Sequence, residues 1–571
     1  MPPVFTPALR LPQKQATAWV TETTTSATRS WLNTLSRGDS NLAARELYRS
    51  LYTLNRLDLR PKTREGILEL YRYPVNRVAA ANQSQLGQQT FPLTENARRL
   101  TEIVRELLRE MATGYKIVVV DSHATWRQRL FRKSIAVPIE RSLRYLGELL
   151  VHCYHVYMAY PPLIWLEVHE LYRYAQQLGL EQVPVDISKR EGAGTTNINE
   201  RYSQICLLGL TNPYRLPQGE ARKVHSFLYR WSGMAGLHHS DASAPKPGWF
   251  YIDLLRDGPP VISRKPVAAS MVKRIRVLDA SALNERIRSF VRQLEKGVPA
   301  SELRVGTECL DSACLEMFRH MLDSWDEVGR RQHGRSQGKG LVSACIGIAS
   351  AHFFADGCRP FLPPKDSAEN GLVMKFGDPG DKDQQFIDFD VPIEIDSLAV
   401  YNDSDTVSLP KDDFHITHWQ IVDQSLKGML LRSRESPGMQ IRVGDILGIQ
   451  FEASADRVWR PAVIRRLQGD MQGFVEIGIE LLGSRYEPVA LRVTNGRTAY
   501  IPALLLPAVD TPEHTRPQSL MFDRGAFRDL SSVQLKIRTA EQVRLIRPLK
   551  LAERSGSFEQ IYFADVVAAD A

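Results

Sequence analysis

Several features that mark common classes of protein are missing from this sequence. The longest uncharged apolar run, LVSACIGIASAHFF at 341–354, is shorter than the ~20 residues that a helix needs to cross a bilayer. The first residues, MPPVFTPALRLPQKQ, show no basic stretch followed by an apolar core, so they do not indicate a secretory signal. We therefore expect a cytoplasmic protein without membrane insertion.

Cysteine is also scarce. The six cysteines are Cys153, Cys206, Cys309, Cys314, Cys345 and Cys358. No two of them form a CxxC pair, which disfavours a closed zinc site or a thioredoxin-like redox site. A chain of 571 residues can bury a large core without disulfides, so we expect reduced and mostly buried thiols.

Signatures of catalysis are missing as well. His169-Glu170 begins like an HExxH zinc motif, but Arg173 stands where the second histidine belongs. The segment Gly192-Ala-Gly194 lacks the lysine of a phosphate-binding loop, and neither a GxSxG nucleophile elbow nor a dinucleotide fingerprint occurs. We expect no enzyme, no metal and no cofactor.

The charge is positive but dispersed. Lysine and arginine number 73 against 65 acidic residues, which gives a net charge of +8. Such an excess suits an anionic partner, although it is equally compatible with solvated faces spread over the whole surface. No run of five or six basic residues marks a nucleic-acid-binding tail, so we expect no nucleic-acid partner.

Helical periodicity dominates residues 1–245. Apolar residues recur at intervals of three and four at Ala97, Leu100, Val104, Leu107 and Met111. Residues 168–178 repeat the pattern and end at Gly179, a typical position for a helix C-cap. These stretches predict an all-α interaction domain of helix hairpins, loosely solenoid-like but without a fixed repeat. KIVVV at 116–120 is compatible with either a strand or a buried helix.

The pattern changes after residue 245. WFYIDLL and PVIS flank Asp257-Gly258, which predicts a hairpin, and a helical stripe follows at 283–294. Residues 246–328 therefore form a hairpin-plus-helix connecting region. From Leu341 on, period-two alternation predicts strands, first at 342–348 and again at 475–481. We expect an α+β multidomain protein with a β-barrel at 329–485 and a β-rich region at 486–571.

Two short motifs lie in the barrel region. Arg331-Gln-His-Gly-Arg335 precedes the strand that begins near Leu341, and Asp423-Gln-Ser425-Leu-Lys-Gly428 ends the strand HWQIV. An RxxxR segment followed by DxSxxG, with a closing GIEL strand, resembles the PilZ domain family. The resemblance covers about Arg331 to Gly483, in the C-terminal part of the chain only. We interpret the acidic residues 353–417, which separate the two motifs, as an insertion in the barrel.

PilZ domains bind cyclic di-GMP, and the resemblance implies a role for each motif residue. Arg331 and Arg335 would close over the ligand, because a planar guanidinium bonds phosphate or a guanine edge in pairs and stacks on a base. Asp423 and Ser425 would meet the ligand from the barrel, and Gly428 would let the backbone turn tightly and the ligand approach. Arg330 adjoins the first motif and is a further candidate.

The resemblance predicts a bacterial cyclic di-GMP receptor that couples nucleotide binding to contact with an unidentified effector protein. The alternative is a PilZ-like scaffold that binds no nucleotide and acts through its helical half. Nucleic-acid binding, a third class, rests on the positive charge alone. The sequence does not choose among motility, pili, exopolysaccharide and virulence as the pathway.

Overall fold

The computed structural model describes residues 9–15, 19–35, 39–87, 91–123, 132–187, 194–240, 244–263, 265–303, 305, 311–326, 336–364, 414–434, 440–453, 456–470, 472–494, 499–511, 514–527, 534–539 and 542–566. The chain forms two compact units, which are described separately. The first unit comprises Met1–Lys339, Gln420–Val443 and Ile464–Glu480, and the second comprises Gly340–Trp419, Gly444–Val463 and Leu481–Ala571.

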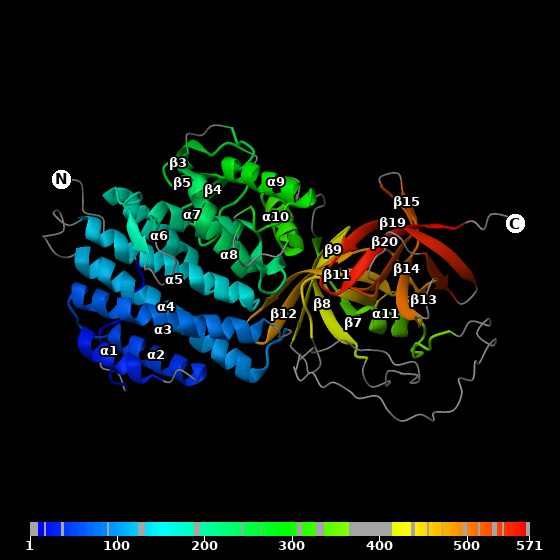
Figure 1. The fold of residues 1–571 in the computed structure, drawn as a ribbon, viewed down its shortest axis with the longest axis horizontal. Coiled ribbons are helices and arrows are strands. Elements are labelled where there is room, and N and C mark those ends of the chain that lie inside the picture. Colours follow the sequence, from blue (N-terminus) through cyan, green and yellow to red (C-terminus); the bar gives the residue numbers. More distant parts are fainter. Residues whose placement is uncertain are drawn as a thin grey trace, which may run out of the picture. The chain divides into compact units, whose positions relative to one another are not determined.

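The first unit begins with a stack of helices, coloured blue to green in Figure 1. They are α1 (Thr25–Thr34), α2 (Ser40–Leu54), α3 (Pro61–Leu86), α4 (Glu95–His123), α5 (Ala136–His155), α6 (Ile164–Leu178), α7 (Ile198–Leu210) and α8 (Glu220–Trp231). Three short 3₁₀ helices are η2 (Arg132–Ile135), η4 (Pro213–Arg215) and η5 (Ser232–Met234), and the short strands β1 (Val185–Ile187) and β2 (Gly194–Thr196) pair with each other. The predicted all-α N-terminal half is confirmed.

Local sequence sets the ends of these helices. The Asp39 carboxylate accepts hydrogen bonds from the backbone N–H groups of Asn41 and Leu42, which caps α2. Pro61 occupies the first turn of α3, where no intrahelical N–H bond is needed. Gly179 ends α6 in the left-handed conformation (φ 65°), as its position in the sequence predicts.

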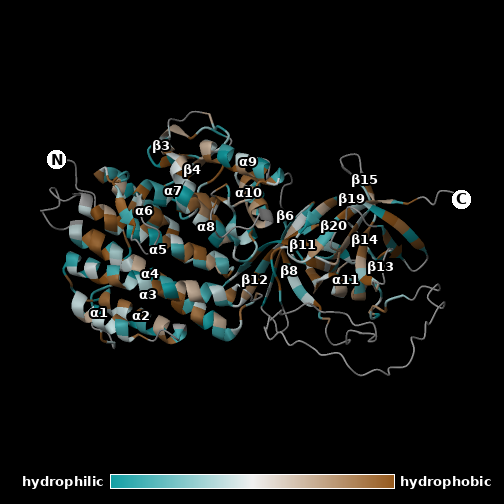
Figure 2. Ribbon diagram, in the orientation of Figure 1, coloured by the Kyte–Doolittle hydropathy of each residue, from teal (hydrophilic) through white to brown (hydrophobic). Residues whose placement is uncertain are grey.

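One apolar core runs through the helical stack. Consecutive helices pack along it, and Figure 2 shows hydrophobic and hydrophilic stretches side by side on each of them. The ambiguous segment 116–120 belongs to α4, where Val118 and Val119 are buried in this core. This valine-rich segment is helical because the amphipathic pattern of the flanking helical turns outweighs the β preference of the individual valines.

The connecting region differs from its prediction. It contains β4 (Trp249–Asp253), β5 (Ile275–Asp279), η6 (Ala269–Met271), α9 (Ser281–Glu295) and α10 (Asp311–Trp325). The strand β3 (Gly236–His239) lies just before this region and pairs with β5. The strand β4 pairs along its whole length with β5, and the expected hairpin partner contributes only the bridge between Tyr251 and Val261. The two segments that flank Asp257-Gly258 therefore meet at one antiparallel bridge and do not form a longer paired ladder.

The turn residue Asp257 has another task. Its carboxylate accepts hydrogen bonds from the backbone N–H groups of Leu163 (2.6 Å) and Trp165 (3.1 Å), at the start of α6. Leu163 is the N-cap residue of α6, adopts φ 70° and provides no side-chain cap. The N–H groups at the start of this helix therefore depend on the distant Asp257 as their hydrogen-bond acceptor. The Asp-Gly turn thus also docks its loop on α6.

A first barrel follows the connecting region. Its strands are β6 (Ser336–Gln337), β7 (Leu341–Ile346), β8 (Thr417–Ser425), β9 (Gly428–Arg434), β10 (Ile446–Phe451), β11 (Arg460–Gly469) and β12 (Phe474–Leu481). The sheet order is β6-β8-β7-β10-β11-β12-β9, and β8 also pairs with β9, so six strands close on themselves with β6 added beside β8. The strand predicted at 342–348 ends at Ile346, because Gly347 (φ 88°) begins α11 (Ile348–Ala355).

A second barrel occupies the C-terminal region. Its six strands are β13 (Glu487–Val493), β14 (Ile501–Leu506), β17 (Ser519–Asp523), β20 (Phe558–Asp565), β19 (Val543–Arg554) and β18 (Leu535–Arg538), in that order around the barrel. The strands β15 (Val509–Thr511) and β16 (His514–Arg516) form a separate ribbon. The predicted fold class, a helical half followed by a PilZ-like antiparallel barrel and a β-rich region, is confirmed.

The thiols follow expectation with one exception. Cys153, Cys206 and Cys345 are buried and free, and Cys358 is exposed and free. Cys314 is disulfide-bonded, so the expectation of reduced cysteines is wrong at that position. Among the helices that the structure describes, none is both long enough and apolar enough to cross a membrane.

Candidate functional site

The DxSxxG motif forms a tight hairpin between β8 and β9. Ser425 pairs with Gly428, Gln424 with Met429 and Asp423 with Leu430, so only Leu426 and Lys427 lie in the loop. The Ser425 hydroxyl donates a hydrogen bond to the Gly428 carbonyl at 3.1 Å, which closes the turn. Asp423 and Ser425 therefore both lie at the end of β8, and the hydrogen bond of the Ser425 side chain helps to fix the geometry of the turn.

Gly428 is required by a close approach of backbones. A Cβ atom at this position would lie 2.3 Å from the carbonyl oxygen of Ile479 on β12, much nearer than any real contact. The register Gly428↔Glu480 makes this contact part of the β9–β12 ladder. Gly428 thus sets the distance between the hairpin and the GIEL strand.

The strand β6 follows the first motif directly in the sequence and pairs with the second motif. Ser336, which directly follows Arg335, pairs with Gln424, and Gln337 pairs with Asp423. The backbone N–H of Gly338 then donates to the carbonyl of Val422 at 3.1 Å. A Cβ atom on Gly338 would lie 2.2 Å from Cγ2 of Ile421, so only glycine permits this crossing. The predicted residues Arg330, Arg331 and Arg335 themselves lie outside the described residues.

The strand β6, which follows the RxxxR segment directly in the sequence, thus pairs with the end of β8 that carries Asp423. Residues 365–413, most of the predicted insertion, lie outside the described residues, and β7 and β8 are neighbours in the sheet on either side of it.

An arginine cluster that sequence reasoning missed lies farther along the same strands. The guanidinium of Arg432 stacks on the Phe474 ring with 4.4 Å to the centroid, and Arg434 lies over the same ring at 5.1 Å. Asp470 holds Arg432 by an ion pair of 3.3 Å. Alternation along β9, with Met429 and Leu431 buried, is the signal that could have placed Arg432 on the outer face.

Loops of the helical part contact the turn between β11 and β12, all within the first unit. The Gly469 N–H donates to the Tyr157 carbonyl at 2.7 Å, and the Ala159 N–H donates to the Gly469 carbonyl at 3.1 Å. Phe91 and Ile441 exchange two backbone hydrogen bonds at 3.3 and 2.8 Å. The end of β11, the strand beside β12 in the barrel, and the residue Ile441 are thereby hydrogen-bonded to loops of the helical part through main-chain contacts.

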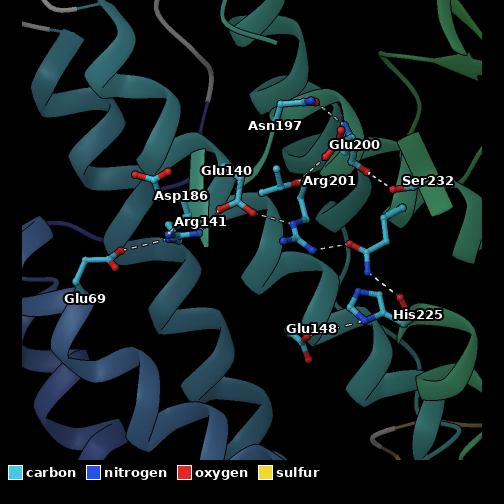
Figure 3. Close-up of polar contacts among 12 residues, drawn as sticks. Glu69, Glu140, Arg141, Glu148, Asp186, Asn197, Glu200, Arg201, His225 and Ser232 are labelled. Carbon is cyan, nitrogen blue, oxygen red and sulfur yellow. Dashed lines mark hydrogen bonds and ion pairs between the residues drawn. The ribbon is translucent and has the colours of Figure 1, made fainter. Parts of the chain in front are cut away.

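A buried polar network lies inside the helical part, and the sequence analysis did not identify it. Figure 3 shows Arg141 and Arg201 on either side of Glu140 of α5. Arg201 Nε lies 2.9 Å and Arg141 Nη1 lies 2.6 Å from the two carboxylate oxygens. Burial alone would raise the pKa of Glu140, but the attraction of Arg201 and Arg141 outweighs burial and lowers it. The carboxylate is thus ionised and holds α5 to α7.

A second buried pair continues this network along α5. Arg222 of α8 lies 2.7 Å from Glu148. Burial opposes the charge of Glu148, yet Arg222 and His225 together hold its pKa at about 2. Burial lowers the pKa of His225 to about 3 against the attraction of Glu148, so this imidazole is neutral at pH 7. The network ties α5, α7 and α8 together as a structural element of the helical half.

Comparison with known proteins agrees with this architecture in three successive parts. The N-terminal domain model of the cyclic-di-GMP receptor FimW matches residues 26–243, its middle PilZ domain model matches 249–488, and the FimW C-terminal beta-barrel domain model matches 489–566. FimW of Pseudomonas aeruginosa is 26% identical over 556 residues, covering 93% of this chain and 89% of its own. No solved structure matches the chain.

These matches correct one prediction. The PilZ resemblance was placed in the C-terminal part only, whereas the PilZ match begins at residue 249 and a separate barrel follows it, so this domain is in the middle of the chain. The segment before Arg331 carries no PilZ motif, and the motifs alone gave no reason to extend the domain toward the N-terminus. The chain is similar to FimW along nearly its whole length, and its middle part, residues 249–488, matches the model of a PilZ domain.

Proposed function

We propose that this protein is a cytoplasmic receptor for cyclic di-GMP. The pairing of β6 with β8 supports the proposal most, because β6 follows the RxxxR segment directly in the sequence and its Gln337 pairs with Asp423 of the DxSxxG hairpin. The similarity to FimW, a cyclic-di-GMP receptor, supports the same ligand. We keep residues 1–245, 246–328, 329–485 and 486–571 as the proposed division into domains.

In this proposal Arg331 and Arg335 close over the phosphodiesters and purines of the ligand, with Arg330 as a further contact. Asp423 and Ser425 contact the ligand from the hairpin. Gly428 has no side chain, which lets the backbone turn tightly and the ligand approach. Hydrogen bonds to charged groups contribute ~1.5–3 kcal/mol each, so loss of one arginine lowers the affinity by about ten-fold or more.

The test is the binding of fluorescently labelled cyclic di-GMP, followed by anisotropy. Arg331→Ala, Arg335→Ala and Asp423→Ala are each expected to weaken binding by at least about ten-fold. Arg292→Ala, which changes an exposed arginine on α9, serves as the matched control and is expected to bind like the wild type. Equal affinity of all four variants would refute the assignment of this site.

We further propose that ligand binding is passed to the helical half, which contacts an effector protein. The main-chain bonds of Gly469 with Tyr157 and Ala159 support this route, because β12 leaves the same turn and packs on Gly428. Hydrogen exchange of the peptide around 151–160 tests it. Exchange that slows on addition of cyclic di-GMP supports the route, and unchanged exchange at saturating ligand contradicts it.

A further inference from the structure

The C-terminal barrel presents two outer faces with different surroundings. On one side, Leu504, Leu506, Met521 and Phe558 of β14, β17 and β20 point outward and pack with Ile348 and Ala351 of α11. The residues that alternate with them, among them Leu505 and Phe522, fill the barrel interior. This outer face is therefore covered within its own unit.

The other outer face is formed by β13, β18 and β19. Leu491 and Ile537 pair across β13 and β18 and are fully buried, so their neighbours Arg492 and Lys536, which also pair, point outward. Continuing across to β19, Lys536 pairs with Leu545, and Arg538 pairs with Val543. Arg547 follows two residues after Leu545 and is exposed. We call Arg492, Lys536, Arg538, Val543, Leu545 and Arg547 the basic face.

The basic face combines positive charge with exposed aliphatic groups. Val543, the first residue of β19, is 50% exposed, and Leu545 on the same side of the strand is 41% exposed. Arg492, Lys536, Val543 and Leu545 line a hollow of about 640 Å³. Its one acidic lining residue, Asp565, forms an ion pair with Arg544 at 2.8 Å. The hollow therefore suits a ligand that brings negative charge and apolar surface together.

The shape of β19 argues against a partner that adds a strand. Beyond Ile546 this strand pairs with β20 alone among the described residues, yet its pairing is irregular between Pro548 and Lys550 and again between Leu551 and Glu553. A proline, a lysine and bulges are features by which proteins block strand addition at an edge. A lipid surface needs no register with the edge, and aliphatic side chains between cations suit the boundary between headgroups and acyl chains.

We propose that the basic face of the C-terminal barrel docks on an anionic phospholipid surface. The cations contact the phosphate headgroups, and Val543 and Leu545 reach toward the acyl region. This contact is peripheral and independent of the cyclic di-GMP site, so either proposal can fail without the other.

Co-sedimentation of the full chain with vesicles tests the proposal. The vesicles contain phosphatidylethanolamine and phosphatidylglycerol in a 3:1 ratio, and vesicles of phosphatidylcholine alone are the neutral reference. Binding to the anionic vesicles is expected to weaken about five-fold for each of Lys536→Gln and Arg547→Gln, and to fall as salt is raised. Leu545→Ser is also expected to weaken binding, since it removes an exposed aliphatic group.

Two control variants match these changes elsewhere on the surface. Arg292→Gln removes one exposed cation from α9, and Leu255→Ser removes a leucine that is 54% exposed in a loop. Both are expected to bind vesicles like the wild type. Absence of binding to the anionic vesicles at low salt would overturn the proposal, and so would equal losses in the face variants and the controls. Circular dichroism of each variant establishes that the fold is retained.

Discussion

Replacing Gly428 by alanine tests whether the β8–β9 hairpin is built around a close backbone contact. An alanine Cβ would lie 2.3 Å from the Ile479 carbonyl oxygen, whereas ordinary contacts begin at 3.4 Å, so β9 and β12 would have to separate locally by about 1.1 Å. The Ile479 carbonyl belongs to the backbone and the alanine Cβ is attached directly to its own backbone, so rotation of a side chain cannot relieve the contact. Overpacking of this kind costs ~1–3 kcal/mol.

The assay measures two quantities on the same protein, the urea midpoint of unfolding and the affinity for cyclic di-GMP. Gly428→Ala is expected to lower both, because the displaced hairpin carries Asp423 and Ser425. Gly556→Ala is the matched control, since nothing lies within 4 Å of its added Cβ and its φ is not positive. If the two variants unfold and bind alike, the argument from the Ile479 contact is wrong.

Other predictions concern the helical half and its attached loop. Burial lowers the pKa values of His152 and His169 to about 4 and that of His225 to about 3, while an unfolded histidine binds a proton below about 6.5. The neutral imidazoles therefore favour the folded state fully above pH 6.5, and the free energy of unfolding falls by about 2 kcal/mol per histidine at pH 5. Urea titrations with the same midpoint at pH 7 and at pH 5 would contradict this. Glu140→Ala leaves Arg141 and Arg201 buried beside an empty position and is expected to destabilise by ~3–5 kcal/mol, against about 1 kcal/mol or less for the exposed Glu285→Ala; equal midpoints in urea would show that the pair contributes nothing. Asp257→Ala removes the acceptor for two N–H groups of α6 and is expected to cost ~1–2 kcal/mol, and an unchanged melting temperature would refute that role.

Regular patterns carried most of the fold prediction. The three-and-four spacing in α4 and α6 gave the helices, and the alternation at 475–481 gave β12, because burial of one face imposes a period on the sequence. The hairpin predicted at Asp257-Gly258 is limited to the bridge of Tyr251 with Val261. A turn signal is local, while the pairing of β4 with β5 and the docking of Asp257 on α6 involve distant residues. Local sequence preferences carry no information about such contacts between distant segments.

The candidate site could be predicted only in part for a similar reason. Asp423, Ser425 and Gly428 occur in one short motif, so the sequence alone indicated all three as candidate site residues. The crossing of Gly338 over Ile421 and the stacking of Arg432 on Phe474 join segments far apart in the chain and became visible only in the structure. The buried network around Glu140 joins separate helices and likewise left no local motif.

Calorimetric titration of the full chain with cyclic di-GMP tests the central claim most directly, with GTP and cyclic di-AMP as reference ligands. The proposed function predicts saturable heat with cyclic di-GMP alone, and no such heat once Arg335 is replaced by alanine. Equal heats with all three nucleotides, or none with cyclic di-GMP, would contradict a receptor built on the RxxxR segment and the β8–β9 hairpin.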